Sequence, residues 1–299
     1  MEKPVQLSDH VKLMGNGHFN YYLVGKNTAA LVECGTGAGA LILAEQWSAL
    51  AEKPAVKYIV ILHSHFDHVG GLPVLKELFP QAQVVASSPA RDLLKNEKYI
   101  SFIADNNAVV TQLYKQKGWI GQDPPAYSEN SFPVDITVGE GDKLELDSGI
   151  SLEFIDAAGH SVCSIAAYIP SEQVMLISDA AGAIYSDEFI APVFFHDYAQ
   201  YLQALKKLAP YPVKAVGLGH SRIPVGTEQC RNFFDLAIAC AQQSYDSIAA
   251  SLATGEDETS IAQYLYDNTT IESIRHYSYD TMLASMKLMV KTVKKHQKL

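Results

Sequence analysis

Cysteine is scarce in this chain of 299 residues, and no two cysteines form a CxxC pair. The spacing of the four cysteines argues against a disulfide framework and against a thiolate zinc site. Two of them share a stretch of helical character, but residues ten apart on a helix are separated by about 15 Å, too far for a disulfide. We therefore expect buried, reduced thiols at Cys34, Cys163, Cys230 and Cys240.

Positive charge and long apolar runs are also in short supply. The chain has 23 Lys and Arg against 33 Asp and Glu, for a net charge of −10. Nucleic acid is an unlikely partner, because binding to a phosphate backbone is driven by clustered Lys and Arg. The N-terminus has no apolar secretory segment, and no window approaches the roughly 18 consecutive apolar residues of a membrane span. We expect a soluble, cytoplasmic protein that binds no membrane.

What the chain does have is apolar residues, at 48%, arranged in strand and helix patterns. The segments "VKLM", "FNYYLVG" and "AALVEC" predict strands, "LILAEQWSALAE" predicts a helix, and "YIVIL" predicts a strand that is covered on both faces. Further on, Ser88 and Pro89 predict the capped start of a helix. Strand patterns return between residues 135 and 178, and a helix and a strand follow them. The chain is therefore predicted to be α/β, with the strand and helix layer repeated.

Two regions depart from this pattern. Residues 96–132 combine a helical stretch with an irregular loop and are predicted to be an insertion near the active site. From residue 227 onward the periodicity is helical throughout. We predict a main domain over residues 1–226 and a C-terminal helical cap over residues 227–299.

The segment "HSHFDHVGG" concentrates metal-ligand side chains directly after an apolar run. His63 and His65 are two apart, so on an extended backbone both rings lie on one side and can hold one ion. Asp67 and His68 follow as the chain turns and suit a second ion. The glycines at 70 and 71 are predicted to let the backbone pass close to whatever Asp67 and His68 hold. In a chain of this length, such a cluster would arise by chance on the order of once in ten thousand sequences.

Further ligand-type residues follow three predicted strands. His160 comes after "LEFIDA", Asp179 after "VMLIS" and His220 after "KAVGLG". Ligands gather at the carboxyl ends of strands in α/β sheets, so we expect these side chains to lie together. The histidine pair and a third histidine form one site. Asp67, His68 and another histidine form a second, and a carboxylate can bridge the two ions.

Together, "HSHFDHVGG", "AGHS", "SDA" and "GLGHS" resemble the five-motif signature of the metallo-β-lactamase-fold hydrolase superfamily, over residues 11–222. The resemblance implies an αββα sandwich with its metals at one sheet edge, here with a C-terminal helical extension. It also implies that the first metal is held by His63, His65 and His160, and the second by Asp67, His68 and His220, with Asp179 as the bridge. "ALVECG" matches the early strand of the family but carries Glu33 where aspartate is usual.

This resemblance implies a hydrolytic mechanism. Two divalent cations, zinc, iron or manganese, held about 3.5 to 4 Å apart lower the pKa of a shared water from about 15.7 toward 7, so that a bridging hydroxide is the nucleophile. Asp67 is the predicted catalytic residue, which orients that nucleophile and accepts its proton. A thiolate leaves without being protonated, so thioesters are suitable substrates.

Within the superfamily, the chain most resembles the 2-aminobenzoylacetyl-CoA thioesterase type of quinolone signalling. The shared segments are "ALVE", "IDAAGHS", "FFHDYAQYLQALKKL" and "YDTMLASMKLMV". The resemblance implies a small-molecule thioester or ester as substrate, with helices capping the metal site.

Other branches of the superfamily are less favoured. Asp179 disfavours a true β-lactamase, His65 stands where flavodiiron proteins have glutamate, and no flavodoxin-like segment follows. Four alternatives remain open: a glyoxalase II-like enzyme, a lactone hydrolase, a mono-iron oxidoreductase of the persulfide dioxygenase type, and a regulatory binding protein that retains the metal site. The oligomeric state is also open, a homodimer included.

Substrate-contact residues are harder to predict from the sequence. His196 and Tyr198 could face the site, but their place in "FFHDYAQY" favours a polar pair at the entry to a helix. Tyr277 and Tyr279 in "RHYSYD" could line a pocket, but the helical context favours a packing role in the tail.

Overall fold

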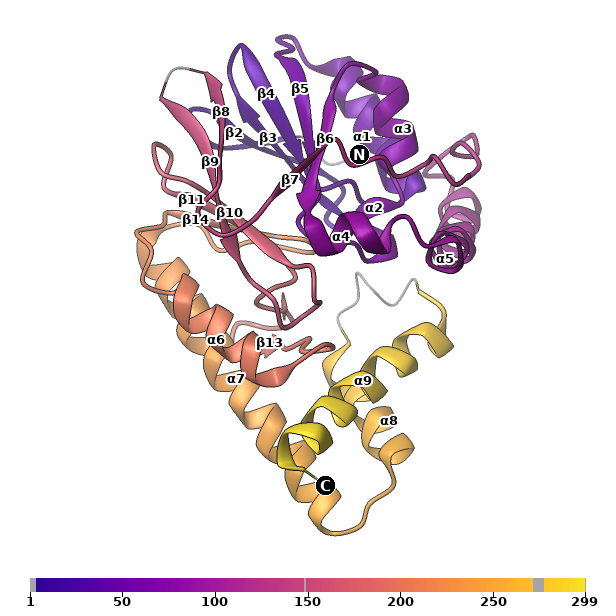
Figure 1. Cartoon of the computed structure of the whole chain (residues 1–299), viewed down its shortest axis with the longest axis vertical. Coiled ribbons are helices and arrows are strands. Elements are labelled where there is room, and N and C mark those ends of the chain that lie inside the picture. Colours follow the sequence, from indigo (N-terminus) through magenta and orange to yellow (C-terminus); the bar gives the residue numbers. More distant parts are fainter. Residues whose placement is uncertain (1–3, 148, 271–276, 299) are drawn as a thin grey trace.

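The computed structural model describes residues 4–147, 149–270 and 277–298. Two β-sheets stand face to face, and helices cover their outer faces (Figure 1). The first sheet has seven strands in chain order: β1 (Val5–Ser8), β2 (Val11–Gly15), β3 (Asn20–Gly25), β4 (Thr28–Val32), β5 (Ala55–Val60), β6 (Gln83–Ser87) and β7 (Ile136–Val138).

The first sheet changes from antiparallel to parallel pairing at β4. Strands β1 to β4 pair antiparallel through short turns, whereas β4, β5, β6 and β7 pair parallel. Parallel neighbours need crossover connections, which are helical here. They are α1 (Gly37–Ala49), α2 (Phe66–Val69), α3 (Leu72–Leu78), α4 (Ser88–Leu93) and α5 (Glu97–Gln116).

The start of α4 differs by one residue from the sequence prediction. Ser88 was expected to be the cap, but the oxygen that accepts from the Ala90 backbone N–H belongs to Ser87. Ser88 is the first helical residue, and Pro89 stands in the first turn, where it gives up no intrahelical hydrogen bond. Two successive serines offer two possible caps, and the end of β6 at Ser87 decides between them.

The second sheet has five strands in the order β14-β11-β10-β9-β8. Its strand pairs are antiparallel except for β11 and β14, which are parallel neighbours. The chain between these two strands contains the helix α6 (Tyr198–Leu208). The strands are β8 (Lys143–Asp147), β9 (Ile150–Asp156), β10 (Ile165–Ile169), β11 (Val174–Ser178) and β14 (Ala215–Leu218), with a small hairpin of β12 (Ala183–Ile184) and β13 (Ile190–Ala191).

The core is divided into three layers that follow from strand alternation. Along β4, Ala29 and Leu31 pack under the helices of the first sheet, whereas Ala30 and Val32 face the second sheet. Because successive side chains of a strand point to opposite faces, a strand buried on both faces is apolar throughout. The third layer lies between the second sheet and the helices α6 and α7. The predicted αββα sandwich is confirmed.

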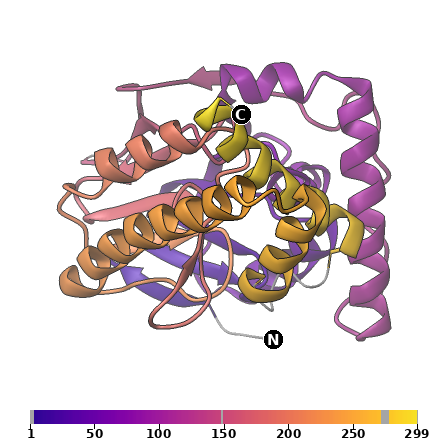
Figure 2. The same cartoon turned by 90° about the horizontal axis from the view of Figure 1, so that it is seen from below.

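The C-terminal part is helical, as predicted. It consists of α7 (Thr227–Ala253), α8 (Glu258–Thr269) and α9 (Tyr279–Gln297), and α7 and α9 lie across the lower end of the sandwich (Figure 2). Three methionines of α9, Met282, Met286 and Met289, are buried in the same core layer as Phe233 and Phe234 of α7. Within the described ranges, every helix is too short or too polar to cross a membrane. The division at residue 226 stays a prediction.

The four cysteines are buried, as expected, and each is free in the structure.

Candidate metal centre

The strand ends bring the predicted ligand residues to one edge of the sandwich. His63 follows β5, His160 follows β9, Asp179 follows β11 directly, and His220 follows β14. His65 stands at the N-terminal end of α2, the short helix that carries Asp67 and His68. Because both sheets present the carboxyl ends of these strands to the same place, residues up to 157 positions apart meet there.

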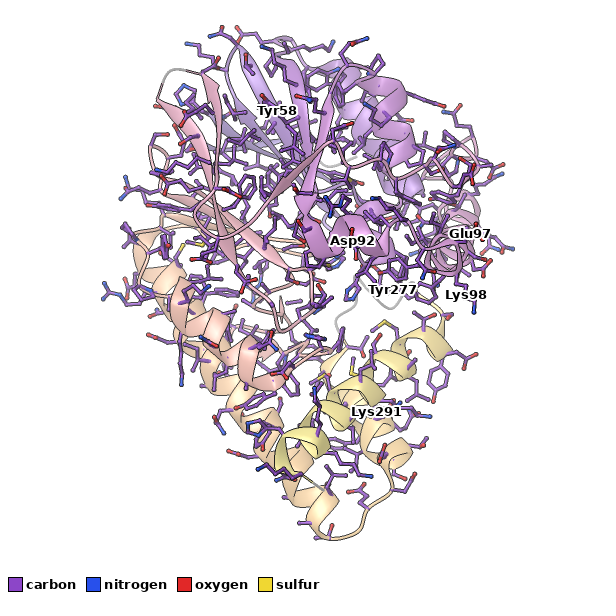
Figure 3. All side chains as sticks on the ribbon, viewed as in Figure 1. Tyr58, Asp92, Glu97, Lys98, Tyr277 and Lys291 are labelled. Carbon is purple, nitrogen blue, oxygen red and sulfur yellow. The ribbon has the colours of Figure 1, made fainter. Side chains whose placement is uncertain are left out.

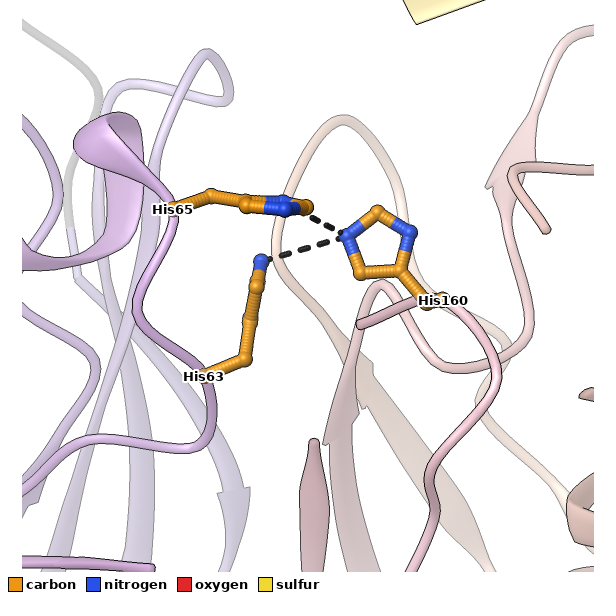
Figure 4. Close-up of side chains that lie close together, drawn as sticks. All are labelled: His63, His65 and His160. Atoms are coloured by element: carbon orange, nitrogen blue, oxygen red, sulfur yellow. Dashed lines mark hydrogen bonds between the residues drawn. The ribbon is translucent and has the colours of Figure 1, made fainter. Parts of the chain in front are cut away.

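The first group of ligand atoms consists of three imidazole nitrogens. Nε2 of His160 lies 3.3 Å from Nε2 of His63 and 2.9 Å from Nδ1 of His65 (Figure 4). Nδ1 of His160 donates a 2.7 Å hydrogen bond to the Val193 carbonyl. A carbonyl can only accept, so the proton of neutral His160 is on Nδ1 and its Nε2 lone pair faces the other two rings. This arrangement leaves three nitrogens converging on one point.

The second group joins Asp67, His68 and His220. Nε2 of His68 and Nε2 of His220 are 3.2 Å apart, and Oδ2 of Asp67 lies 3.4 Å from the first and 3.3 Å from the second. Nδ1 of His220 donates to the backbone carbonyl of His18 at 2.6 Å, and Nδ1 of His68 donates to Oε2 of Glu33. Such partners fix which nitrogen faces a metal and raise its basicity. Glu33, which stands where the family usually has aspartate, therefore orients His68.

Asp179 lies between the two groups. Its Oδ2 is 3.7 Å from Nε2 of His160, 3.3 Å from Nε2 of His68 and 3.6 Å from Nε2 of His220. A carboxylate in this position can contact an ion in either group. The structure thus brings together all seven residues that the sequence selected, and their role as metal ligands stays a prediction: His63, His65, Asp67, His68, His160, Asp179 and His220.

The electrostatics of the cluster favour added positive charge. Burial alone would lower the pKa of His220, yet the carboxylates of Asp179 and Asp67 raise it to about 10. Burial likewise opposes ionisation of Asp67 and Asp179, but His68 and His220 hold the pKa of both carboxyls well below the usual range. In the absence of ions, protons on His68 and His220 therefore balance the two carboxylates. Divalent cations can take over that role.

The three imidazoles of the first group behave differently. Burial lowers the pKa of His65 to about 3, and it lowers the pKa of His63 and His160 as well. These rings are neutral at physiological pH, and neutral imidazole is the form that ligates metals. In a tetrahedral site with bonds of about 2.0 to 2.1 Å, ligand atoms are about 3.3 to 3.4 Å apart. The separations of 3.2 to 3.4 Å in the two groups fit such an ion, whereas the 2.9 Å between His160 and His65 is shorter.

The backbone around the site is tightly packed, and the glycines show where. A Cβ on Gly219 would lie 2.5 Å from Cε1 of His68 and 2.6 Å from Oδ1 of Asp179, so only glycine fits beneath the cluster. Gly70 and Gly71 serve a purpose other than the predicted one. A Cβ on Gly70 would meet the amide of Asn107, and one on Gly71 would lie 2.0 Å from the Cys34 carbonyl. These glycines admit neighbouring protein groups rather than a ligand.

A cavity of about 270 Å³ opens over the two groups. Its floor is formed by His65, Asp67, His160, Asp179 and His220. Most of the other lining side chains are apolar or aromatic, and none of the described lining residues is Lys or Arg. They are contributed by α2, α5, α9, the residues just before α9 and the segments around β12 and β13: Phe66, Tyr99, Phe102, Gly182, Ala183, Val193, Phe195, Tyr277, Thr281, Met282, Ser285 and Leu288.

The residues considered for substrate contact have different surroundings in the structure. His196 is exposed and Tyr198 is the first residue of α6, where its hydroxyl donates to Gln242 at 2.9 Å. The helix-entry interpretation is therefore correct, and their neighbour Phe195 lines the cavity instead. The packing interpretation was wrong for Tyr277, whose hydroxyl donates to Asp67 in the cavity.

Tyr279 conforms better to the expected packing role. Its ring packs edge-on against Tyr266 at 5.1 Å, outside the cavity. Nothing in the local sequence separates Tyr277 from Tyr279, or marks out Phe195 and Phe102, because their surroundings come from distant segments.

Known proteins provide an independent comparison. The sequence model of the metallo-beta-lactamase superfamily matches residues 14–220. The putative diflavin flavoprotein A 2 of Synechocystis is 26% identical over 68% of this chain and 32% of its own length. A metallo-beta-lactamase fold-containing protein of Sulfurisphaera tokodaii is 26% identical over 54% of this chain and 59% of its own. The chain thus spans about a third and about three-fifths of these two relatives.

Solved structures extend the likeness to nearly the whole chain. A metallo-beta-lactamase family protein from Thermus thermophilus superposes with a TM-score of 0.67 at 18% identity, over 98% of this chain and 95% of that one. A subclass B3 metallo-beta-lactamase of Bradyrhizobium japonicum superposes over 85% of this chain and 97% of that one, with a TM-score of 0.58 at 17% identity. At such identities the likeness is evidence for the fold alone.

Proposed function

Because the chain belongs to the metallo-beta-lactamase superfamily, we propose that it is a metal-dependent hydrolase of thioesters or related esters. The observation that carries the proposal is the pair of ligand groups around Oδ2 of Asp179, which form the floor of a cavity with largely apolar walls. The superfamily consists mostly of metal-dependent hydrolases, and the donor set here fits two divalent ions of the zinc, iron or manganese type.

The chemistry follows from the residues on the cavity floor. Divalent ions bound there would supply a water of lowered pKa and polarise the acyl carbonyl. Asp67 would orient the attacking water and accept its proton at the carboxylate. The phenylalanines at 66, 102 and 195 in the walls would exclude bulk water, which strengthens the interactions at the reacting carbonyl. A thiolate leaving group departs without a proton, so hydrolysis of a thioester needs no dedicated acid.

The lining also bears on the substrate. The described lining residues include no Lys or Arg to pair with a buried anion, which favours a substrate whose buried part is uncharged and largely apolar. An acyl chain attached to a thiol carrier meets this requirement, because any charged carrier group can stay outside. This supports the finer proposal of a thioesterase of the 2-aminobenzoylacetyl-CoA type.

The test combines metal analysis with a substrate panel. Purified protein should contain two divalent ions per chain and should hydrolyse apolar acyl thioesters faster than the matched oxygen esters, lactones or β-lactams. Asp67→Asn should lower kcat by about 10² to 10⁴. Asp105→Asn is the matched control, because Asp105 is exposed on α5 and does not line the cavity. Metal-loaded protein that turns over no member of the panel would refute the proposal.

A second candidate function is suggested by the relatives. Diflavin flavoproteins of Synechocystis and Nostoc match this chain at 22 to 26% identity. Ligand sets of nitrogen and oxygen also suit iron, so an iron-dependent oxidoreductase is the alternative. Bound iron, together with oxygen consumption in the presence of a reductant and no thioester hydrolysis, would favour it over the hydrolase.

A further inference from the structure

A tyrosine of the C-terminal tail reaches the floor of the cavity. Tyr277 precedes α9, and its hydroxyl donates a 2.6 Å hydrogen bond to Oδ2 of Asp67, 210 positions earlier in the chain. In Figure 3 Tyr277 lies between α9 and the upper part of the molecule that carries α2 and α5. The oxygen that accepts from Tyr277 is the one that faces His68 and His220.

The position of this hydroxyl is fixed by packing on both sides. The Tyr277 ring packs edge-on against Phe66, the residue before Asp67, with ring centroids 4.9 Å apart. Thr281 in the first turn of α9 donates to the side chain of Asn106 on α5 at 2.9 Å. The next residue of α5, Asn107, donates to the Phe66 carbonyl at 3.1 Å. The start of α9, the helix α5 and the short helix α2 that carries Asp67 are thereby connected.

The hydrogen bond from Tyr277 differs from the other contacts of Asp67 in one respect. His68 and His220 can donate to Asp67 only through Nε2, because their Nδ1 atoms are engaged with Glu33 and with the His18 carbonyl. When an ion binds, each of these Nε2 atoms must lose its proton so that its lone pair can ligate the ion. It then no longer donates to Asp67. Of the contacts that the structure shows for the Asp67 carboxylate, the one from Tyr277 is compatible with a bound ion.

We infer that Tyr277 is a positioning residue, whose hydroxyl holds the carboxylate of Asp67 toward His68 and His220, so that the helical tail completes the second ligand group. The inference deepens the proposed function and, where turnover is concerned, rests on it. Burial and the nearby Asp67 carboxylate raise the pKa of Tyr277 well above its usual value. The hydroxyl is therefore the donor in this contact.

The test is Tyr277→Phe, with Tyr279→Phe as the matched control. The first substitution removes the hydroxyl and keeps the ring that packs against Phe66. The second makes the same change two residues along, where the hydroxyl bonds Gln263 outside the cavity. The readouts are the Zn²⁺ dissociation constants from competition with a chromophoric chelator, the visible spectrum of the Co²⁺ form, and kcat and KM on an acyl thioester.

Tyr277→Phe should fold normally and weaken binding of one of two Zn²⁺ ions by about 10-fold to 100-fold, the range found when partners that orient metal ligands are removed. Its Co²⁺ spectrum should change, and kcat should fall with little change in KM. Tyr279→Phe should match the wild type in each readout.

Wild-type zinc constants and a wild-type Co²⁺ spectrum in Tyr277→Phe would overturn the inference, whether or not any thioester is hydrolysed. If the wild-type protein hydrolyses no thioester while Tyr277→Phe still loses zinc affinity, the proposed substrate class fails and the positioning role stands.

Discussion

At the scale of single residues, the atoms that face away from the site decide what the site can bind. Glu33 and the carbonyls of His18 and Val193 accept hydrogen bonds from Nδ1 of His68, His220 and His160, which leaves the Nε2 atoms of these rings for the cluster. Glu33 achieves this from a strained backbone, with φ at 76° at the end of β4. Non-glycine residues adopt that conformation at a cost of about 1 to 3 kcal/mol, which the surrounding contacts must offset.

Metal binding should therefore release protons. In the ion-free protein the pKa of His220 is about 10 and that of His68 is raised well above its usual value, so both rings are protonated at pH 7. Ions must displace these protons, so affinity should fall as the pH falls below about 10, with on the order of two protons released per chain at pH 7. Titration calorimetry in buffers of different protonation enthalpy measures that number. Metal binding without proton release would contradict the predicted ligand set.

At the scale of elements, two helices from distant parts of the chain form the wall of the cavity. Helix α5, within the 96–132 segment, contributes Tyr99 and Phe102, and α9 of the tail contributes Met282 and Leu288. The side chains of Asn106 and Thr281 link the two helices. The predicted ligand residues stand on strand ends and on α2, so apolar wall residues such as Phe102 can vary without altering them.

Phe102→Ala should therefore change substrate preference and leave the metal content intact. We expect KM for a long or aromatic acyl thioester to rise about 3-fold to 10-fold, because apolar contact with the acyl group is lost, while kcat and metal stoichiometry stay the same. Val109→Ala is the matched control, since Val109 is on the same helix and exposed to 42%, against 44% for Phe102, but does not line the cavity. Steady-state kinetics with acetyl and longer acyl thioesters measure the difference. An equal rise in KM for acetyl thioester, or an equal rise in KM caused by Val109→Ala, would count against contact between Phe102 and the acyl group.

At the scale of the whole molecule, the site joins the two halves of the sandwich. The first sheet contributes His63, and the helix α2 that follows it contributes Asp67 and His68. The second sheet contributes His160, Asp179 and His220. An ion held by ligands from both sheets binds only the folded chain and so stabilises it.

Removal of metal should accordingly lower the melting temperature. At a thousandfold excess over its dissociation constant, one ion contributes about 4 kcal/mol to the free energy of unfolding, which corresponds to a fall of about 10 °C on chelation. Differential scanning fluorimetry with and without a chelator checks this. His160→Ala, which removes a predicted ligand contributed by the second sheet, should show a smaller chelator-induced fall in melting temperature. Zn²⁺ added back to the chelated wild-type protein should restore its original melting temperature. An unchanged wild-type melting temperature would argue against ions that bridge the two sheets.

The sequence by itself determined the fold class and the residues of the cluster. Alternation and apolar runs marked the strands, and the ligand-type residues stood directly after them, so local pattern was enough to place His63, His160, Asp179 and His220 at strand ends. The helical tail was also readable from its periodicity. These features depend on contacts that are local in sequence or that repeat along an element.

Only the tertiary structure decided what surrounds the cluster. Tyr277 and Tyr279 are equivalent in sequence, yet one reaches Asp67 across 210 positions and the other does not. The role of Glu33 depends on where the His68 ring lies, and the glycines at 70 and 71 make room for Cys34 and Asn107 rather than for a ligand. Periodicity tells which face of a helix is buried, but not against which partner, because that choice depends on the packing of the whole chain.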